Sequence, residues 1–154
     1  LVAHAQSHSA DLTAFSILVS GSSKVYSMSP RTFYLNTILT PFSRLPHPTW
    51  IIRRSSISYL YRESPIAKRC EDYIFLLDNA FDINILNTAA IFYDTNKSLS
   101  FILEIRSGFC KSLMFLFKSK SLLSIAVALA YILARILRLV FSTHKLPFSQ
   151  FILK

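Results

Sequence analysis

Glycine is scarce in this sequence of 154 residues. Only Gly21 and Gly108 are present, whereas an average usage of about 7% would give about eleven. Phosphate-binding loops and the nucleophile turn of serine hydrolases both need glycines clustered within a few residues. Two distant glycines can build neither motif, so enzyme classes that depend on them are largely excluded.

Cysteine is also scarce, with only Cys70 and Cys110. They are 40 positions apart, and no CxxC pair exists that would indicate a zinc or redox motif. Lone cysteines are more often free and buried than paired, so we expect two thiols rather than a disulfide. Neither residue indicates a redox compartment.

Acidic residues number eight against 17 Lys and Arg, which gives a net charge of +9. The charge is unevenly distributed: residues 1–62 carry +5, residues 63–104 carry −4, and residues 105–154 carry +8 with no acid. Such asymmetry indicates an anionic partner, either a membrane or a nucleic acid. The mean hydropathy of +0.41 and a charged fraction of 16%, against about 25% in ordinary domains, favour the membrane.

The stretch Leu113–Phe141 contains no Gly or Pro and is rich in good helix formers. We predict a hydrophobic helix over 113–141, most strongly over Ser121–Phe141. At helical spacing, the small or polar residues of that part form one narrow stripe, and nearly everything else is Leu, Ile, Val, Ala or Phe. The stripe consists of Ser121, Ser124, Ala128, Tyr131, Arg135 and Arg138.

A bilayer span needs about 20 mainly apolar residues. Ser121–Ala134 is uncharged but too short, and extension to Phe141 includes Arg135 and Arg138. On insertion scales, the apolar gain and the cost of the arginines sum to near zero or to a mildly favourable value. Three geometries therefore stay open: a span, a helix lying in the interface, and the core helix of a soluble bundle.

Five residues are the candidates for anchoring this helix at a membrane. Arg135 and Arg138 would meet anionic headgroups at one end, and Lys118 and Lys120 at the other, while Tyr131 is an amphipathic side chain suited to the interface. Because basic residues flank both ends, the positive-inside rule gives no orientation.

The predicted fold class is mainly α, with one long C-terminal hydrophobic helix and the remainder short helices or irregular. We divide the chain into a polar, Ser- and Pro-rich N-terminal segment and linker (1–49), a mixed segment with an acidic middle (50–106) and a basic C-terminal segment (107–154). The apolar run Tyr73–Tyr93 fits both helical and strand spacing, and its length favours a helix.

No catalytic, cofactor-binding or metal site is predicted. His4, His8 and Asp11 have a spacing that a metal site can use, but a frayed terminus explains them better. Asp82 and Asn84 resemble the start of a calcium loop, yet the later ligand positions do not fit. We therefore expect a protein that is not an enzyme and needs no cofactor.

Three functional hypotheses follow. The first is a small, basic, non-enzymatic protein that binds the lipid bilayer through helix 121–141 and is located at a membrane. The second is a fragment or an unselected translated reading frame, because the chain starts at Leu1 and is rich in Phe, Leu, Ile and Ser. The third, less favoured, is a nucleic-acid-binding accessory protein, organellar if the Ser- and Arg-rich N-terminal part is a transit peptide. Its candidate residues are Arg53, Arg54, Tyr59, Tyr61 and Arg62.

Overall fold

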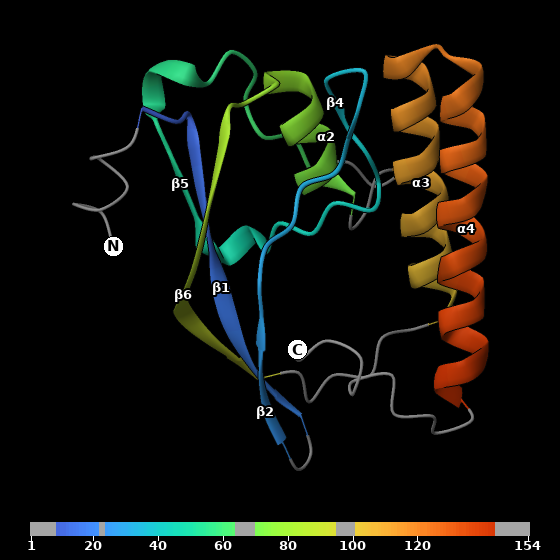
Figure 1. Cartoon of the computed structure of the whole chain (residues 1–154), viewed down its shortest axis with the longest axis horizontal. Helices are drawn as coiled ribbons and strands as arrows, with labels where there is room; N and C mark the ends of the chain where they lie inside the picture. Colours follow the sequence, from blue (N-terminus) through green and yellow to red (C-terminus); the bar gives the residue numbers. More distant parts are fainter. Residues whose placement is uncertain (1–8, 22–23, 64–69, 95–100, 144–154) are drawn as a thin grey trace.

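The computed structural model describes residues 9–21, 24–63, 70–94 and 101–143. A sheet occupies one side of the molecule, a pair of long helices the other, and a short helix with a small hairpin lies between them (Figure 1). The strands are β1 (Leu12–Gly21), β2 (Lys24–Met28), β3 (Tyr34–Leu35), β4 (Ile38–Leu39), β5 (Trp50–Ile52) and β6 (Ile83–Asp94). The α-helices are α2 (Glu71–Asn79), α3 (Phe101–Ser119) and α4 (Leu122–Thr143), and two short 3₁₀ helices are η1 (His47–Thr49) and η2 (Arg54–Ser56).

Strand β1 is the centre of the sheet. On one side it pairs in parallel with β6, from Leu12 opposite Ile83 onward. On the other side it pairs antiparallel with β5 near its start and with β2 near its end. Its side chains are buried on both faces, including Leu12, Ala14 and Phe15, as expected for an apolar strand with neighbours on both edges.

Asp11 joins three segments at the start of the sheet. Its carboxylate accepts hydrogen bonds from the Ser56 hydroxyl and from the backbone N–H of Asp82, at 3.1 Å for the latter. Its own carbonyl accepts the N–H of Arg53 at 2.8 Å. The side chain therefore ties the beginning of β1 to the segments that follow β5 and precede β6.

These contacts predict a pH dependence of stability. The hydrogen bonds from the Ser56 hydroxyl and the Asp82 N–H hold the pKa of Asp11 below its usual value. Burial opposes them in part, and the charge of Arg53 adds a smaller lowering. A depressed folded-state pKa gives stability that is present above the unfolded pKa of about 3.9 and is lost as the pH falls through the folded value. We expect the urea midpoint to fall below pH 4, and the fall to be smaller in Asp11→Asn. If the urea midpoint of Asp11→Asn falls below pH 4 as much as that of the wild type, Asp11 does not have this role.

The prediction of a mainly α fold is wrong, because the described residues combine three α-helices with a mixed sheet. Much of the difference lies in the run Tyr73–Tyr93, which we expected to be helical. Helix α2 ends where Ala80 adopts a left-handed conformation with φ of 50°, and the following residues enter strand β6. The sequence of this run fits both the helical and the strand period, and the pairing with β1 makes its second half a strand.

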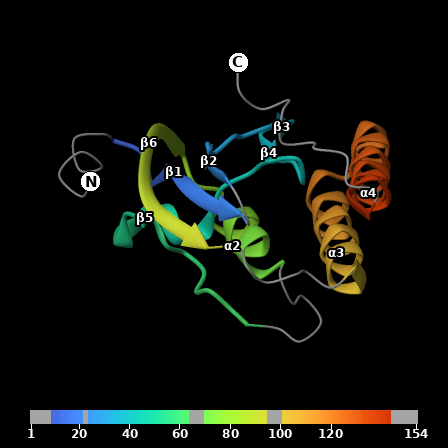
Figure 2. The same cartoon turned by 90° about the horizontal axis from the view of Figure 1, so that it is seen from below.

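The single helix predicted over 113–141 is also wrong, because the chain reverses within it. Lys120 takes a left-handed φ of 47° after the last residue of α3, and its N–H bonds to the carbonyl of Leu116 at 3.2 Å. Helices α3 and α4 then run side by side as a helical hairpin (Figures 1 and 2). The helix expected most strongly, over Ser121–Phe141, is confirmed as α4.

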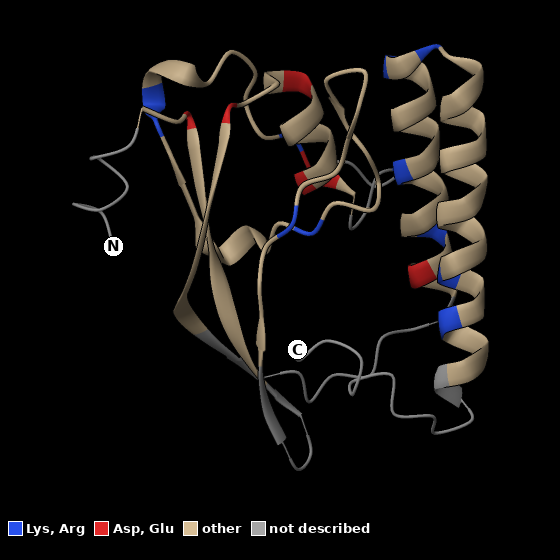
Figure 3. Ribbon diagram, in the orientation of Figure 1, with Lys and Arg blue, Asp and Glu red and all other residues tan. Residues whose placement is uncertain are grey.

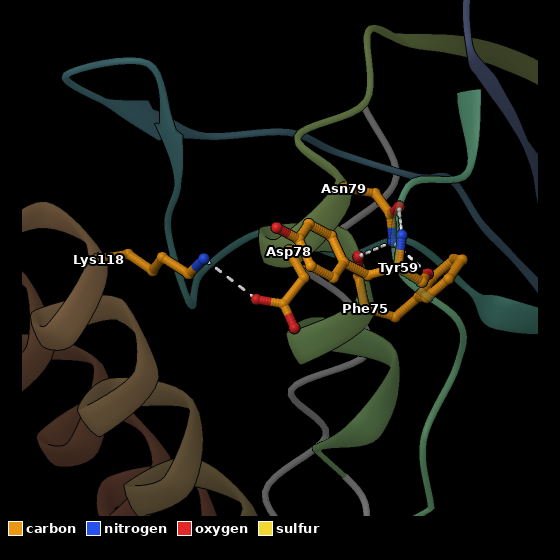
Figure 4. Close-up of polar contacts among 5 residues, drawn as sticks. All are labelled: Tyr59, Phe75, Asp78, Asn79 and Lys118. Atoms are coloured by element: carbon orange, nitrogen blue, oxygen red, sulfur yellow. Dashed lines mark hydrogen bonds and ion pairs between the residues drawn. The ribbon is translucent and has the colours of Figure 1, made fainter.

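Helix α2 is packed between the sheet and the helical hairpin. Its buried Tyr73 donates a hydrogen bond to the carbonyl of Leu39 at 2.7 Å, and Asp78 forms an ion pair with Lys118 of α3 at 3.1 Å. At its C-terminal end, the Asn79 side chain accepts the N–H of Tyr59 and donates to the carbonyls of Tyr59 and Phe75 (Figure 4). Helix α3 thus connects the hairpin to α2.

Candidate functional site

The polar stripe of α4 faces α3. Ser124, Ala128 and Tyr131 are buried, and the hydroxyl of Ser112 on α3 donates to the carbonyl of Ala128 at 3.3 Å. Gly108 of α3 faces Arg135, and a Cβ there would lie in ordinary contact at 3.4 Å from Cγ of that residue. The small and polar stripe found in the sequence is therefore, from Ser124 to Arg135, a seam between two helices.

An ion pair closes this seam. Nη1 of Arg135 lies 2.8 Å from Oε2 of Glu104 on α3, and the two side chains are only 20% and 16% exposed. The guanidinium also lies 5.7 Å from the centre of the Tyr131 ring. Arg135 is consequently compensated inside the hairpin, which the sequence alone did not show.

The opposite face of α4 is exposed and apolar, and we call it the outer face. The charged residues of α4 are Arg135 and Arg138, both in the stripe (Figure 3). The large exposed side chains of the outer face are Leu122, Leu123, Ile125, Leu129, Leu133, Ile136, Leu137, Val140 and Phe141. At 1.5 Å per residue, the 22 residues of α4 extend about 33 Å. In the described part of the chain, Leu122–Phe141 is the one stretch long and apolar enough to cross a membrane, and only 17% of it is buried.

Helix α3 exposes apolar side chains too. Ile102, Phe109, Leu113 and Phe117 are spaced by seven, four and four residues, which places them on one helical face. Ile102 and Phe117 are each more than 70% exposed. Large contiguous apolar patches are unusual on the surface of monomeric soluble proteins.

The structure places the five candidate anchoring residues in different surroundings. Lys118 is paired with Asp78, and Lys120 is exposed at the turn between α3 and α4. Tyr131 is buried and makes an edge-to-face contact with Phe42, with ring centres 5.1 Å apart. Arg135 lies in the seam and Arg138 is exposed one turn further on. The anchoring role of all five stays a prediction.

A cavity of about 720 Å³ lies between the helical hairpin, the sheet and the loop after β4. The hairpin lines it with Lys111 and with residues of α4 from Tyr131 to Arg138. The walls of the cavity carry Arg44 from the loop, Lys111 from α3, and Arg135 and Arg138 from α4, with Asp72 the one carboxylate. We call it the basic cavity. Sequence reasoning missed it because its cations come from segments up to 94 residues apart in the chain.

The structure places the other candidate residues only in part. His4 and His8 lie outside the described residues, and no cluster suited to a metal occurs among those that are described. Tyr61, a candidate for stacking on nucleic acid bases, instead stacks on His47 at 5.8 Å and donates to Asp72.

The two cysteines are free thiols in mutual contact. Burial, together with the hydrogen bond to Cys110, raises the pKa of the Cys70 thiol well above its usual value. The sequence predicted free, buried thiols, but it gave no indication that residues 40 positions apart would meet.

No family model, curated protein or solved structure matches this chain.

Proposed function

We propose that this is a non-enzymatic, membrane-associated protein whose α4 helix lies in the surface of a lipid bilayer. The observation that carries the proposal is the outer face of α4, an exposed apolar surface that extends over Leu122–Phe141, about 30 Å at 1.5 Å per residue. Amphipathic helices of this kind bury the apolar face at the boundary between headgroups and acyl chains. The net charge of +9 favours the anionic surfaces of cellular membranes.

An interfacial position fits the structure better than a span. The seam of α4 is occupied by α3, and α3 contains Glu104, Arg106 and Lys111 and packs on α2 and β4. A spanning α4 would either leave α3 or carry those charges into hydrocarbon, at several kcal/mol each. Lying flat, α4 keeps its seam contacts and places only the outer face in lipid.

Flotation with phosphatidylcholine vesicles tests the proposal. We expect the protein to float, and a variant with glutamine at Leu122, Leu129, Leu133 and Leu137 to partition at least about 100-fold less. Burying a leucine side chain contributes about 1.5–3 kcal/mol, and even half of that over four residues exceeds the roughly 2.7 kcal/mol that 100-fold requires. Leucine and glutamine have similar helix propensities, so α4 should remain helical.

A matched control replaces four exposed apolar residues elsewhere with glutamine. These are Phe33, Tyr34, Tyr59 and Leu60. The control should float like the wild type. Failure of the wild-type protein to float would overturn the proposal, and equal losses in both variants would show that the outer face is not the contact. Retention of the protein on vesicles after an alkaline wash would replace the interfacial position with a span.

A further inference from the structure

We propose that the basic cavity binds a phosphate group, and that in the membrane-bound protein this is the phosphate of an anionic phospholipid. The inference rests on the proposed membrane association and adds a headgroup site to it. The cavity's volume of about 720 Å³ lies within the range of about 300–1,000 Å³ typical of small-ligand sites. That size accommodates a phosphate with its glycerol and the first carbons of the acyl chains.

The walls of the cavity are positive. Arg44, Lys111, Arg135 and Arg138 against Asp72 leave a formal charge of +3 with His47 neutral. Asp72 is engaged by His47, whose Nδ1 is 3.3 Å away, and by the Tyr61 hydroxyl at 2.9 Å. Glu104 does not line the cavity, but it neutralises Arg135 and so reduces the excess to +2. Arginine and lysine on several sides of one cavity match the charge and the acceptor oxygens of a phosphate.

Two of these cations have no carboxylate within ion-pair distance among the described residues. Within the described residues, neither Lys111 nor Arg138 forms an ion pair. Lys111 is held 5.7 Å from the centre of the Tyr73 ring. Burial, and then the nearby positive charge of Arg135, lowers the pKa of Lys111. Asp72 and Glu104 oppose this shift only in part, and a bound anion would give Lys111 the direct partner that neither carboxylate provides.

The cavity also adjoins the outer face of α4. Ala134 and Arg138 line it, and their neighbours Leu133 and Leu137 are 56% and 44% exposed on the apolar side. Ile17, Met28 and Phe42 add apolar wall on the side of the sheet and the loop. A headgroup in the cavity would therefore leave its acyl chains beside the surface that we place in the bilayer, which favours a phospholipid over free phosphate.

The test compares two charge-matched double variants on two kinds of vesicle. Arg44→Gln/Arg138→Gln removes cations from opposite walls of the cavity, and Arg54→Gln/Arg62→Gln removes two exposed cations that do not line it. Each basic residue at an anionic surface contributes about 1 kcal/mol. We expect the cavity variant to bind vesicles containing phosphatidylglycerol about 30-fold more weakly than the wild type, and the control less than about 3-fold more weakly. Circular dichroism checks that both variants are folded.

Vesicles of phosphatidylcholine alone separate this inference from the proposed function. If the wild-type protein binds neither kind of vesicle, the membrane proposal is overturned. Equal binding of the two double variants to phosphatidylglycerol vesicles, with binding to phosphatidylcholine intact, would overturn the cavity site alone. A thermal shift with glycerol 3-phosphate that the cavity variant lacks would support the site. Should that shift occur without any preference for anionic vesicles, the ligand is a free phosphate and the lipid assignment is wrong.

Discussion

Replacing Phe115 with alanine is expected to lower the free energy of unfolding by about 3–5 kcal/mol, the cost usual for a buried phenylalanine. The side chain is fully buried. It belongs to a core cluster that includes Leu39 and Leu76 from the body of the protein and Ala128 from α4. Its removal opens a void where the helical hairpin joins the rest of the molecule. Urea unfolding followed by circular dichroism measures the loss.

Phe117, two residues away on α3, provides the control. It is 72% exposed, so Phe117→Ala should change the stability by no more than about 0.5 kcal/mol. Equal effects of the two replacements would show that α3 does not pack as described. The absence of any cooperative transition in the wild-type protein would instead favour the hypothesis of an unselected reading frame.

The second large effect concerns Glu104. Glu104→Leu leaves Arg135 in the seam without its partner, and loss of one member of a fully buried pair costs about 3–5 kcal/mol. Because these side chains are 16% and 20% exposed, we expect a smaller loss of about 2–3 kcal/mol in urea unfolding.

The double variant Glu104→Leu/Arg135→Leu should recover most of that stability. Replacement of a whole buried ion pair by apolar residues is often neutral or stabilising, whereas removal of one partner is not. A double-mutant cycle measures this coupling. If the losses of the two single variants simply add, the ion pair does not hold α3 and α4 together.

The sequence was most informative about α4. Its apolar residues repeat at helical spacing over more than five turns, so the helix and its stripe could be described in advance. Which side of the helix would be buried could not, because it depends on α3 packing against the stripe. The reversal at Lys120 could not be predicted, because lysine is a good helix former and rarely adopts the left-handed conformation that it has here. A glycine at that position would have indicated the break.

The sheet and the basic cavity were harder to predict for a different reason. Strand β6 becomes a strand through its contact with β1, about 70 residues earlier in the chain, and the run Phe81–Ile85 fits either period. Likewise, Arg44 and Arg138 line one cavity, but nothing in their local sequence relates them. Pairings over such distances depend on tertiary structure, which a single sequence without internal repeats does not reveal.

The placement of β1 at the centre of the sheet has a consequence for how the protein folds during synthesis. Its parallel partner ends at Asp94, so the ladder cannot be completed until about 70 more residues have followed β1. At about 5–20 residues per second, this takes roughly 4–15 s on the ribosome. During that interval an apolar strand, buried on both faces in the finished protein, has one unpaired edge. Folding that depends on such distant contacts is slow and vulnerable to aggregation, so nascent chains halted before residue 83 are the form most in need of a chaperone.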